Sequence, residues 1–224
     1  MRKILCLLIF SVFCFADSVD DVILNVERKL RSLRSLQANF SQIYYSSSVS
    51  TPLNEKGKFY FQKPDWMRWE YKDPEEKIFL YKEGTSLMYF PEDKEVIQSD
   101  LSKEKYESEI LTLLSGQKNL KDDYTIEFSP FPSDSQKTWK VKLTPKKESD
   151  YTHVLLEIDE KTWLIRKAIF FDWAGNKQEF QFSQIRTDVR FPRKVFELEL
   201  PPDVEIIKDE PPEPNENIQG NSRT

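Results

Sequence analysis

From Leu36 onward the chain alternates apolar and polar residues in short segments that are rich in aromatic side chains. A period of two residues indicates β-strands with one buried face. Turn signals such as Lys63-Pro64-Asp65 and Lys82-Glu83-Gly84 separate these segments at short intervals, which predicts an antiparallel meander. The expected strands cover 38–45, 57–62, 66–71, 77–81, 86–90, 95–98, 124–128, 138–144, 152–159, 164–171, 178–185, 194–200 and 204–207.

Two segments show helical spacing instead. Ser18 is suited to cap a helix over about 18–35, whose apolar stripe recurs every three or four residues from Val22 to Phe40. Its polar face is basic, so binding to a membrane surface is one interpretation. The favoured interpretation is an amphipathic helix that covers the protein's own sheet. A second helix is expected over 101–115, ended by Gly116.

The first sixteen residues have the pattern of a secretory signal peptide. Arg2 and Lys3 precede an apolar run over 4–15, which is too short to cross a bilayer comfortably. Small side chains near the end of this run predict cleavage after Ala16. An uncleaved membrane anchor is the alternative. We therefore expect an exported protein that begins near Asp17.

Both cysteines, Cys6 and Cys14, lie in this segment, so the mature chain would carry no disulfide and no thiol chemistry. Phe13 precedes Cys14, where lipid attachment requires a small residue, and this argues against a lipoprotein. The expected domains are a cleaved signal peptide over 1–16, one folded domain over 17–207 and a disordered, acidic, proline-rich tail over 208–224.

Composition gives no positive case for catalysis or for nucleic-acid binding. The chain has 38 acidic and 33 basic residues, a net charge of −5, whereas phosphate backbones need a basic face. Its 5 glycines leave no phosphate-binding loop. The one histidine, His153, forms neither a catalytic triad nor an imidazole metal cluster and is interpreted as a solvated strand residue. We expect no enzyme, no cofactor, no metal and no nucleic-acid partner.

The aromatic content, 13% of the residues, needs a structural explanation. Many aromatic residues fall on strands of what should be one curved sheet. They would form either an ordinary core under the helices or the wall of a cavity for an apolar ligand. Composition alone favours the ordinary core. The candidate cavity residues are Phe59, Phe61, Met67, Trp69, Tyr71, Phe79, Tyr89, Phe180 and Phe182.

Six segments of the chain, in this order, resemble those of a known protein family. They are LQANFSQ at 36–42, GKFYFQKP at 57–64, MRWEY at 67–71, DPEEKIFLYKEGTSLMYF at 73–90, FQFSQI at 180–185 and FELELPPDVEII at 196–207. The family is that of the periplasmic outer-membrane lipoprotein carriers, the LolA family. The resemblance covers most of 19–207, including both expected helices.

The resemblance implies a mainly β fold: an open, incomplete antiparallel β-barrel with an α-helical lid. Its cavity would receive the acyl chains of lipoproteins. Such a carrier, a monomer in the periplasm, would take its cargo from an ATP-driven exporter in the inner membrane and deliver it to the outer membrane. In many members a receptor lipoprotein of the same fold accepts the cargo there. The resemblance implies no catalysis and no cofactor.

The resemblance also implies a basic residue that holds the lid closed in the empty form. Many members have arginine before the proline of GKFYFQKP, where this chain has Lys63. Lysine can bond a carbonyl, but it lacks the forked guanidinium of arginine. Arg68 is a second candidate for this lid contact, although strand alternation places it opposite Met67 and Trp69. Asp203 replaces a glycine that is usual in the closing turn.

Elementary energetics constrain such a carrier. Full burial of about 45 methylenes of three acyl chains would gain roughly 36 kcal/mol, more than the practical ceiling of about 21 kcal/mol for noncovalent affinity. The chains should therefore be only partly buried, or opening of the lid must absorb part of the gain. Extraction from a membrane also needs an energy source, and hence an exporter. A periplasmic lipid or lipoprotein sensor, a structural module of the same fold, a receptor lipoprotein and an exported hydrolase remain alternatives.

Overall fold

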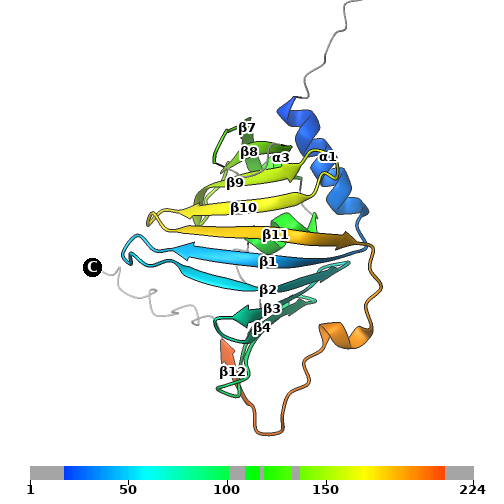
Figure 1. The fold of residues 1–224 in the computed structure, drawn as a ribbon, viewed down its shortest axis with the longest axis vertical. Helices are drawn as coiled ribbons and strands as arrows, with labels where there is room; N and C mark the ends of the chain where they lie inside the picture. The colour runs from blue at the N-terminus through cyan, green and yellow to red at the C-terminus, as the bar shows by residue number, and fades with distance from the viewer. Residues whose placement is uncertain (1–17, 101–108, 117–118, 133–136, 210–224) are drawn as a thin grey trace, which may run out of the picture.

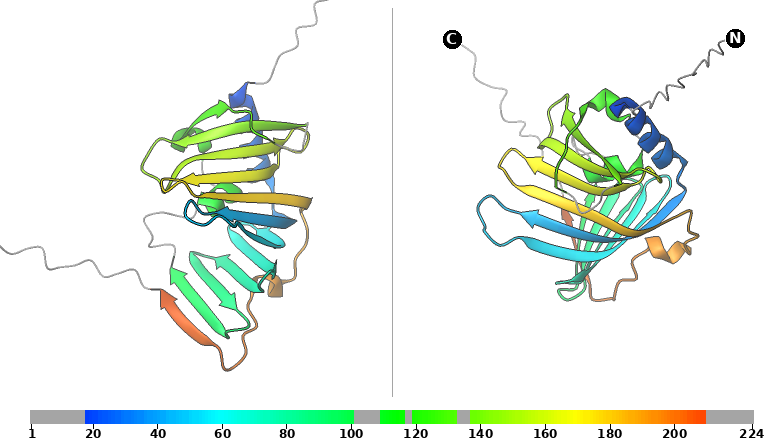
Figure 2. Two further views of the ribbon diagram at one scale, coloured as in Figure 1. Left: turned by 60° about the vertical axis from the view of Figure 1, so that its left-hand side comes forward. Right: turned by 45° about the horizontal axis from the view of Figure 1, so that its top comes forward.

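The fold is built around one curved twelve-stranded sheet in the order β12-β6-β5-β4-β3-β2-β1-β11-β10-β9-β8-β7 (Figure 1). The computed structural model describes residues 18–100, 109–116, 119–132 and 137–209. The predicted signal peptide and the tail beyond Asp209 lie outside these ranges. Neighbouring strands are antiparallel except β12, which runs parallel to β6. The sheet curls without closing, because β7 and β12 form separate edges (Figure 2). The expected mainly β fold with an open, incomplete barrel is confirmed.

The strands agree in number and order with those expected from the sequence, except near the C-terminus. The first six are β1 (Ser35–Tyr45), β2 (Leu53–Gln62), β3 (Trp66–Asp73), β4 (Lys77–Lys82), β5 (Thr85–Phe90) and β6 (Glu95–Asp100). The others are β7 (Tyr124–Phe128), β8 (Thr138–Pro145), β9 (Tyr151–Asp159), β10 (Ile165–Asp172), β11 (Lys177–Thr187) and β12 (Glu205–Asp209). The helices are α1 (Val19–Ser32), α2 (Glu109–Ser115), α3 (Leu120–Asp123) and the 3₁₀ helix η1 (Arg193–Phe196).

The pairing of β1 with β11 joins strands β1–β6 and β12 to strands β7–β11 in one sheet. Phe40 on β1 faces Phe182 on β11 on one side and Gly57 on β2 on the other. Because successive side chains alternate, this register assigns each residue to one of two faces. We call the face that carries Phe59, Trp69 and Phe182 the inner face, and the opposite face the outer face. Figure 1 looks onto the outer face, with α2 visible behind the sheet.

Helix α1 begins as the sequence predicts and ends earlier. The Ser18 side chain accepts a hydrogen bond from the backbone of Asp21, whose carboxylate in turn bonds the Ser18 backbone, so a capping box starts the helix. Leu33 is extended, and Ser35 already pairs with Gln62. The predicted helix over 18–35 is therefore too long. The last members of its apolar stripe, at 36 and 40, belong to β1.

Helix α2 ends at the predicted glycine and packs closely against α1. Gly116 has a φ of 65°, and a Cβ there would lie 2.6 Å from Cβ of Leu30. This close approach and the left-handed backbone both favour glycine. Residues 101–108 of the predicted helix lie outside the described ranges. Helix α3 was not predicted; Asn119 caps it by accepting a hydrogen bond from the backbone of Lys121.

The predicted strand over 194–200 is wrong. The segment forms η1 and then an irregular stretch, between Pro192 and Pro201. Phe196 is 1% exposed, and its ring lies 5.7 Å from that of Trp66. The segment is thus anchored by a buried ring rather than by strand pairing. The final strand does form, and β12 runs through Asp209, so residues 208 and 209 of the predicted tail belong to a strand.

Candidate functional site

The inner face carries a continuous cluster of aromatic rings across β11, β1, β2 and β3. Phe59, Trp69 and Phe79 are direct neighbours in register on three adjacent strands. Ring centroids lie 4.3 Å apart for Phe59 and Trp69, 5.5 Å for Trp69 and Phe180, and 5.8 Å for Phe59 and Phe182. These separations are typical of packed aromatic pairs. We call this group, with Phe40, Phe61, Met67 and Tyr71, the aromatic cluster.

The structure brings together eight of the nine predicted cavity residues. Phe79 is half-buried against the main core, and the other seven are buried: Phe59, Phe61, Met67, Trp69, Tyr71, Phe180 and Phe182. Tyr89 is the exception, and its assignment is corrected. Tyr89 stands opposite Ile78 and Val96 in the register, whereas Phe79 of the inner face stands opposite Met88. Because Tyr89 is the next residue after Met88, its side chain lies on the outer face. It is buried there outside the main core cluster.

Sequence reasoning missed Phe40, because its spacing continued the helical stripe. Its ring lies 4.9 Å from Trp69 and 5.0 Å from Tyr71, both edge-on. The neighbouring Gly57 makes room for it, since a Cβ at that position would lie 2.9 Å from the Phe40 ring and 1.9 Å from the carbonyl oxygen of Glu70. The alternation within the predicted strand over 38–45 was the available signal that Phe40 lies on a buried face.

Helices α1 and α2, which we call the lid, close over one end of the aromatic cluster. An apolar gap lies between the lid and rings of the cluster. On the lid side it is lined by Leu30 of α1, by Leu33, which caps the end of α1, and by Leu114 of α2. The gap measures about 20 Å³, room for about one water-sized group. The interior is therefore closely packed in this conformation. The remaining lining residues are Leu36, Phe59, Phe61, Leu164, Ile165, Phe182 and Ile185.

Lys63 lies where the sequence places a lid contact. Its ammonium group donates a hydrogen bond to the carbonyl oxygen of Arg31, in the last turn of α1. Its backbone N–H also donates to the carbonyl oxygen of Arg34, at 3.0 Å. A cation at the C-terminal end of a helix is favourable, because unsatisfied carbonyls gather there. Lys63 thus connects the end of β2 to the lid.

Arg68 does not contact the lid, which corrects the second candidate. Its guanidinium donates to the carbonyl oxygens of Val195 and Glu197 at 3.3 and 3.2 Å, and pairs with Glu70 at 2.8 Å. Alternation had placed its side chain on the outer face, and this is confirmed. Arg68 therefore holds the C-terminal segment around η1 against the sheet.

A buried carboxylate ties α1 to α3. Glu27 is 5% exposed. One of its oxygens accepts a hydrogen bond from the backbone N–H of Leu120 at 2.7 Å, and the other from Arg31 at 3.0 Å. Hydrogen bonds to an ionised group in a buried position are among the stronger ones in proteins. This contact fixes the middle of α1, whereas Lys63 holds its end.

A polar cluster lies beside the aromatic rings on the inner face. The Tyr71 hydroxyl donates to Gln42 at 2.9 Å, and Lys77 pairs with the buried Glu55 at 2.5 Å. The Lys77 ammonium also lies 4.7 Å from the centre of the Tyr71 ring. Burial, and to a smaller extent the charge of Glu55, raises the pKa of Tyr71 well above its ordinary value. No local pattern pointed to Glu55, which is an isolated acid in an alternating strand.

The one histidine packs within the sheet rather than in a cluster of reactive groups. His153 is half-buried rather than solvated, stacked on Phe171 with centroids 4.4 Å apart, and burial lowers its pKa. Within the described ranges, no group of three or more His, Cys, Asp or Glu residues is placed to hold a metal ion. Over the same residues, no helix combines the length and the apolar character needed to cross a membrane.

The open, curved sheet with its aromatic inner face and helical lid defines a mainly β protein with a closely packed apolar interior. Comparison with known proteins agrees with this class. The family model described as outer membrane lipoprotein carrier protein LolA matches residues 31–199. The chain therefore belongs to the LolA family, whose members carry lipoproteins and are not enzymes.

The relatives cover most of the chain at low identity. The outer-membrane lipoprotein carrier protein of Methylococcus capsulatus is 26% identical over 181 residues, 80% of this chain and 84% of the relative. That of Coxiella burnetii is 23% identical over 201 residues, 89% and 93% of the two chains. Among solved structures, an uncharacterized conserved protein from Thermus thermophilus shares the fold, with a TM-score of 0.57, 11% identity and coverage of 86% and 99%.

Proposed function

We propose that this protein binds the acyl chains of lipoproteins in the periplasm and delivers them to the outer membrane. The observation that carries the proposal is the aromatic cluster, which lies under a lid held at the end of α1 by Lys63. The named role of the relatives supports it. The signal-peptide pattern supports an exported location.

The closely packed interior makes this structure the closed, empty form in our proposal. Acyl chains would enter when α2 and the end of α1 near Leu33 move away, and would replace Leu30, Leu33 and Leu114 against the aromatic rings. Separating the lid from the sheet exposes apolar surface, and this cost would offset part of the gain from burying the chains. The cost of opening the lid thus keeps the net affinity for acyl chains low enough for release.

The partners follow from the energetics. Lipoproteins in a membrane already bury their acyl chains, so extraction requires energy from an ATP-driven exporter in the inner membrane. Delivery requires an acceptor, either a receptor lipoprotein or the outer membrane itself. No catalysis, cofactor or nucleic acid enters the proposal, and one copy of the chain suffices for it.

Mass spectrometry of the protein purified from the periplasm under native conditions tests the proposal. We expect a fraction of the protein to carry an acylated polypeptide. A protein that carries free lipid but no lipoprotein, in cells with abundant lipoprotein traffic, would instead favour a lipid sensor of the same fold. A protein free of both would contradict the proposed role.

A further inference from the structure

A broad groove crosses the outer face, on the side of the sheet opposite the aromatic cluster. It has a volume of about 590 Å³ and spans β9, β10, β11, β1, β2 and β3. The C-terminal segment covers the outer face only farther along, where Arg68 and Trp66 hold it. We call this feature the outer groove. Nothing in the proposed acyl-binding role uses it.

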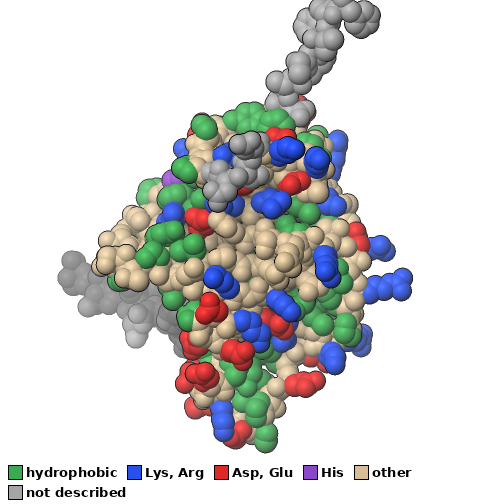
Figure 3. All heavy atoms as spheres, viewed as in Figure 1, with side chains coloured by type: hydrophobic (Ala, Val, Ile, Leu, Met, Phe, Trp, Pro, Cys, Tyr) green, Lys and Arg blue, Asp and Glu red, His purple; other side chains and the backbone are tan. Residues whose placement is uncertain are grey.

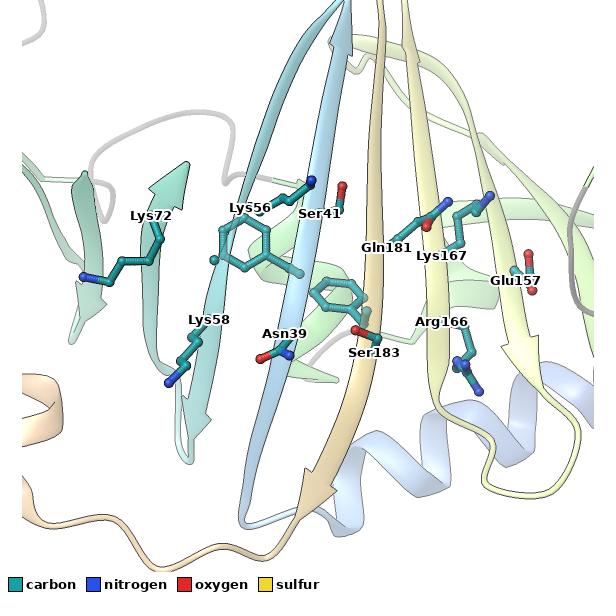
Figure 4. A pocket seen from close by; sticks show the side chains of 13 residues that line it. Asn39, Ser41, Lys56, Lys58, Lys72, Glu157, Arg166, Lys167, Gln181 and Ser183 are labelled. Atoms are coloured by element: carbon teal, nitrogen blue, oxygen red, sulfur yellow. The ribbon is translucent and has the colours of Figure 1, made fainter. Parts of the chain in front are cut away.

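The outer groove has an uncharged polar floor between two cationic sides. The floor consists of Asn39 and Ser41 on β1 and Gln181 and Ser183 on β11. Figure 4 shows Lys56, Lys58 and Lys72 on one side of this floor, and Arg166, Lys167 and Glu157 on the other. In Figure 3, from the side of Figure 1, both basic and acidic side chains lie around an uncharged tract over the middle of the sheet, but the groove itself is lined by five cations and one acid. This is unexpected in a chain whose net charge is −5.

The cations on the two sides differ in their partners. Lys72 pairs with Glu76 at 3.1 Å, Arg166 with Asp159 at 3.3 Å, and Lys167 with Glu179 at 3.2 Å. Lys56 and Lys58 are exposed and have no ion pair among the described residues. Their charges are therefore free to attract an anionic ligand.

Glu157, on the opposite side, is buried, and one of its two carboxylate oxygens lacks a hydrogen-bond partner in the described part of the chain. The residue is 4% exposed, and its Oε2 has no hydrogen bond among the described residues. The two lysines that face it in register are engaged elsewhere: Lys140 donates to the carbonyl oxygen of Phe131 at 2.8 Å, and Lys167 pairs with Glu179. A buried oxygen without a partner is costly, and a ligand that supplies an N–H would remove that cost.

We propose that the outer groove binds an extended acidic segment of a partner polypeptide. Acidic side chains of the segment pair with Lys56 and Lys58, its amides meet the floor at Asn39 and Gln181, and an N–H reaches Oε2 of Glu157. From β2 to β9 there are four interstrand steps, about 19 Å, which an extended chain covers in about six residues.

A polypeptide fits these features better than a membrane does. A flat bilayer surface would meet the exposed lysines, but its headgroups would not satisfy an acceptor as buried as Glu157. The residues that line the groove are polar or charged apart from Phe40, Gly57 and Phe182, and both phenylalanine side chains belong to the inner face. The groove therefore offers charged and hydrogen-bonding side chains rather than large apolar side chains as anchors.

The test uses the full chain and a fluorescein-labelled peptide of alternating glutamate and serine, about six residues long. Fluorescence anisotropy at low salt should show binding that weakens as salt is added. Lys56→Glu/Lys58→Glu should weaken binding by about ten-fold or more, because each change replaces an attraction with a repulsion. Arg193→Glu/Lys194→Glu, on η1, makes the same change in net charge and should alter affinity by about two-fold at most.

Glu157→Leu tests the buried acceptor. It removes a negative charge, so simple electrostatics would strengthen binding of an acidic peptide. We expect weaker binding by about three-fold instead, because an accepted hydrogen bond is lost. Tighter binding in this variant would overturn the proposed placement of the segment.

Two further measurements distinguish a peptide from a lipid headgroup as the ligand of the outer groove, and the outer groove from the acyl site. If Lys56→Glu/Lys58→Glu abolishes binding to phosphatidylglycerol vesicles while the parent ignores the peptide, the groove is a lipid-headgroup site and the proposal is wrong. An acyl probe should bind parent and variant equally, because the lysines lie on the face opposite the aromatic cluster. Failure of the peptide to bind would thus leave the acyl-binding proposal unaffected.

Discussion

The two halves of the inner face are built from different side chains, and in the proposed carrier this difference separates stability from binding. The half formed by β7 to β10 is mainly aliphatic, with Val141, Leu143 and Leu156 at most 1% exposed. Helix α1 contacts β7 in this half, and Glu27 fastens it there through Leu120. The half formed by β11, β1, β2 and β3 is aromatic, and the end of α1 covers it through Leu33 and the Lys63 contact.

This comparison suggests that the aliphatic half is a permanent core and the aromatic half is an exchangeable one. Flexible aliphatic side chains interlock with a fixed helix, and each is left poorly packed if the helix departs. Rigid aromatic rings keep packing against one another when the lid moves, because they meet edge-on within the sheet. In the proposed carrier, the aromatic half would therefore open while the aliphatic half holds the fold.

Truncation of one buried side chain in each half should give the largest changes in the free energy of unfolding. Leu156→Ala and Phe59→Ala should lower the free energy of unfolding by about 2–5 and 3–5 kcal/mol, because each leaves a cavity in a buried site. An acyl ligand should stabilise parent and Leu156→Ala equally, since the aliphatic half does not receive it. The stabilisation by the acyl ligand should differ between the parent and Phe59→Ala. Urea unfolding with and without a fluorescent fatty acid checks this, and a ligand effect altered only by Leu156→Ala would reverse the assignment.

A larger side chain introduced into each half should have a smaller effect on stability, and its effect on ligand binding should differ between the two halves. Ile185 borders the apolar gap in the aromatic half, and Ile126 is likewise half-buried in the aliphatic half. Ile185→Trp and Ile126→Trp should each cost about 1–3 kcal/mol of stability through overpacking. We expect Ile185→Trp alone to reduce binding of the fatty-acid probe. Equal binding by both variants would mean that acyl chains do not enter beside the gap.

Alkaline unfolding should report on Tyr71, at the polar end of the aromatic half. Its pKa is raised in the folded state, so the unfolded state binds fewer protons once the pH exceeds about 10. Stability is therefore complete below that pH and falls above it, by about 1.4 kcal/mol per pH unit for this group. Tyr71→Phe should flatten the fall. Tyr60→Phe, a half-buried tyrosine on the outer face, should flatten it less; a larger effect from Tyr60 would contradict the assignment.

The lid contact should give the smallest effect on stability. Lys63→Leu removes one hydrogen bond from a partly exposed ammonium group, worth about 1.5 kcal/mol or less. Because the bond holds the closed form, its loss should favour the open, loaded form, with cargo retained and poorly transferred. Loaded fractions and transfer to acceptor vesicles measure this.

Two control variants accompany the lid test. Lys194→Leu, on the exposed face of η1, should load and transfer like the parent. Arg68→Leu should also leave transfer unchanged, because its bonds reach the C-terminal segment and not the lid. Equal loading and equal transfer by Lys63→Leu and the parent would exclude Lys63 as a lock.

The strand pattern, the first helix and most of the aromatic cluster were predictable because each depends on local alternation or spacing. The faces of the sheet were predictable only where the alternation was unbroken, as at Met67, Trp69 and Tyr71. Tyr89 was assigned wrongly because an aromatic residue is equally suited to the outer face when another segment covers it. Burial on the outer face depends on long-range packing, such as that of Phe196 of η1 on Trp66, which no local pattern shows.

The burial of Glu27, Glu55 and Glu157 was also beyond sequence reasoning. Each is an acid in an ordinary amphipathic context, and its burial results from residues far away in the chain. Glu27 meets Leu120, 93 positions later. The Lys63 contact was expected from family resemblance, and its carbonyl acceptor at Arg31 became visible only in the folded structure.

The most direct test of the acyl-binding account is a photocrosslinking map. A triacylated peptide with photoreactive groups on its acyl chains would be loaded into the purified protein, irradiated and located by peptide mass spectrometry. We predict crosslinks within β1, β2, β3 and β11, at Phe59, Phe61, Trp69 and Phe182, and on α1 near Leu33. Crosslinks concentrated in β8 and β9, at Leu143 and Leu156, or on the outer face at Lys56 and Gln181, would contradict the account.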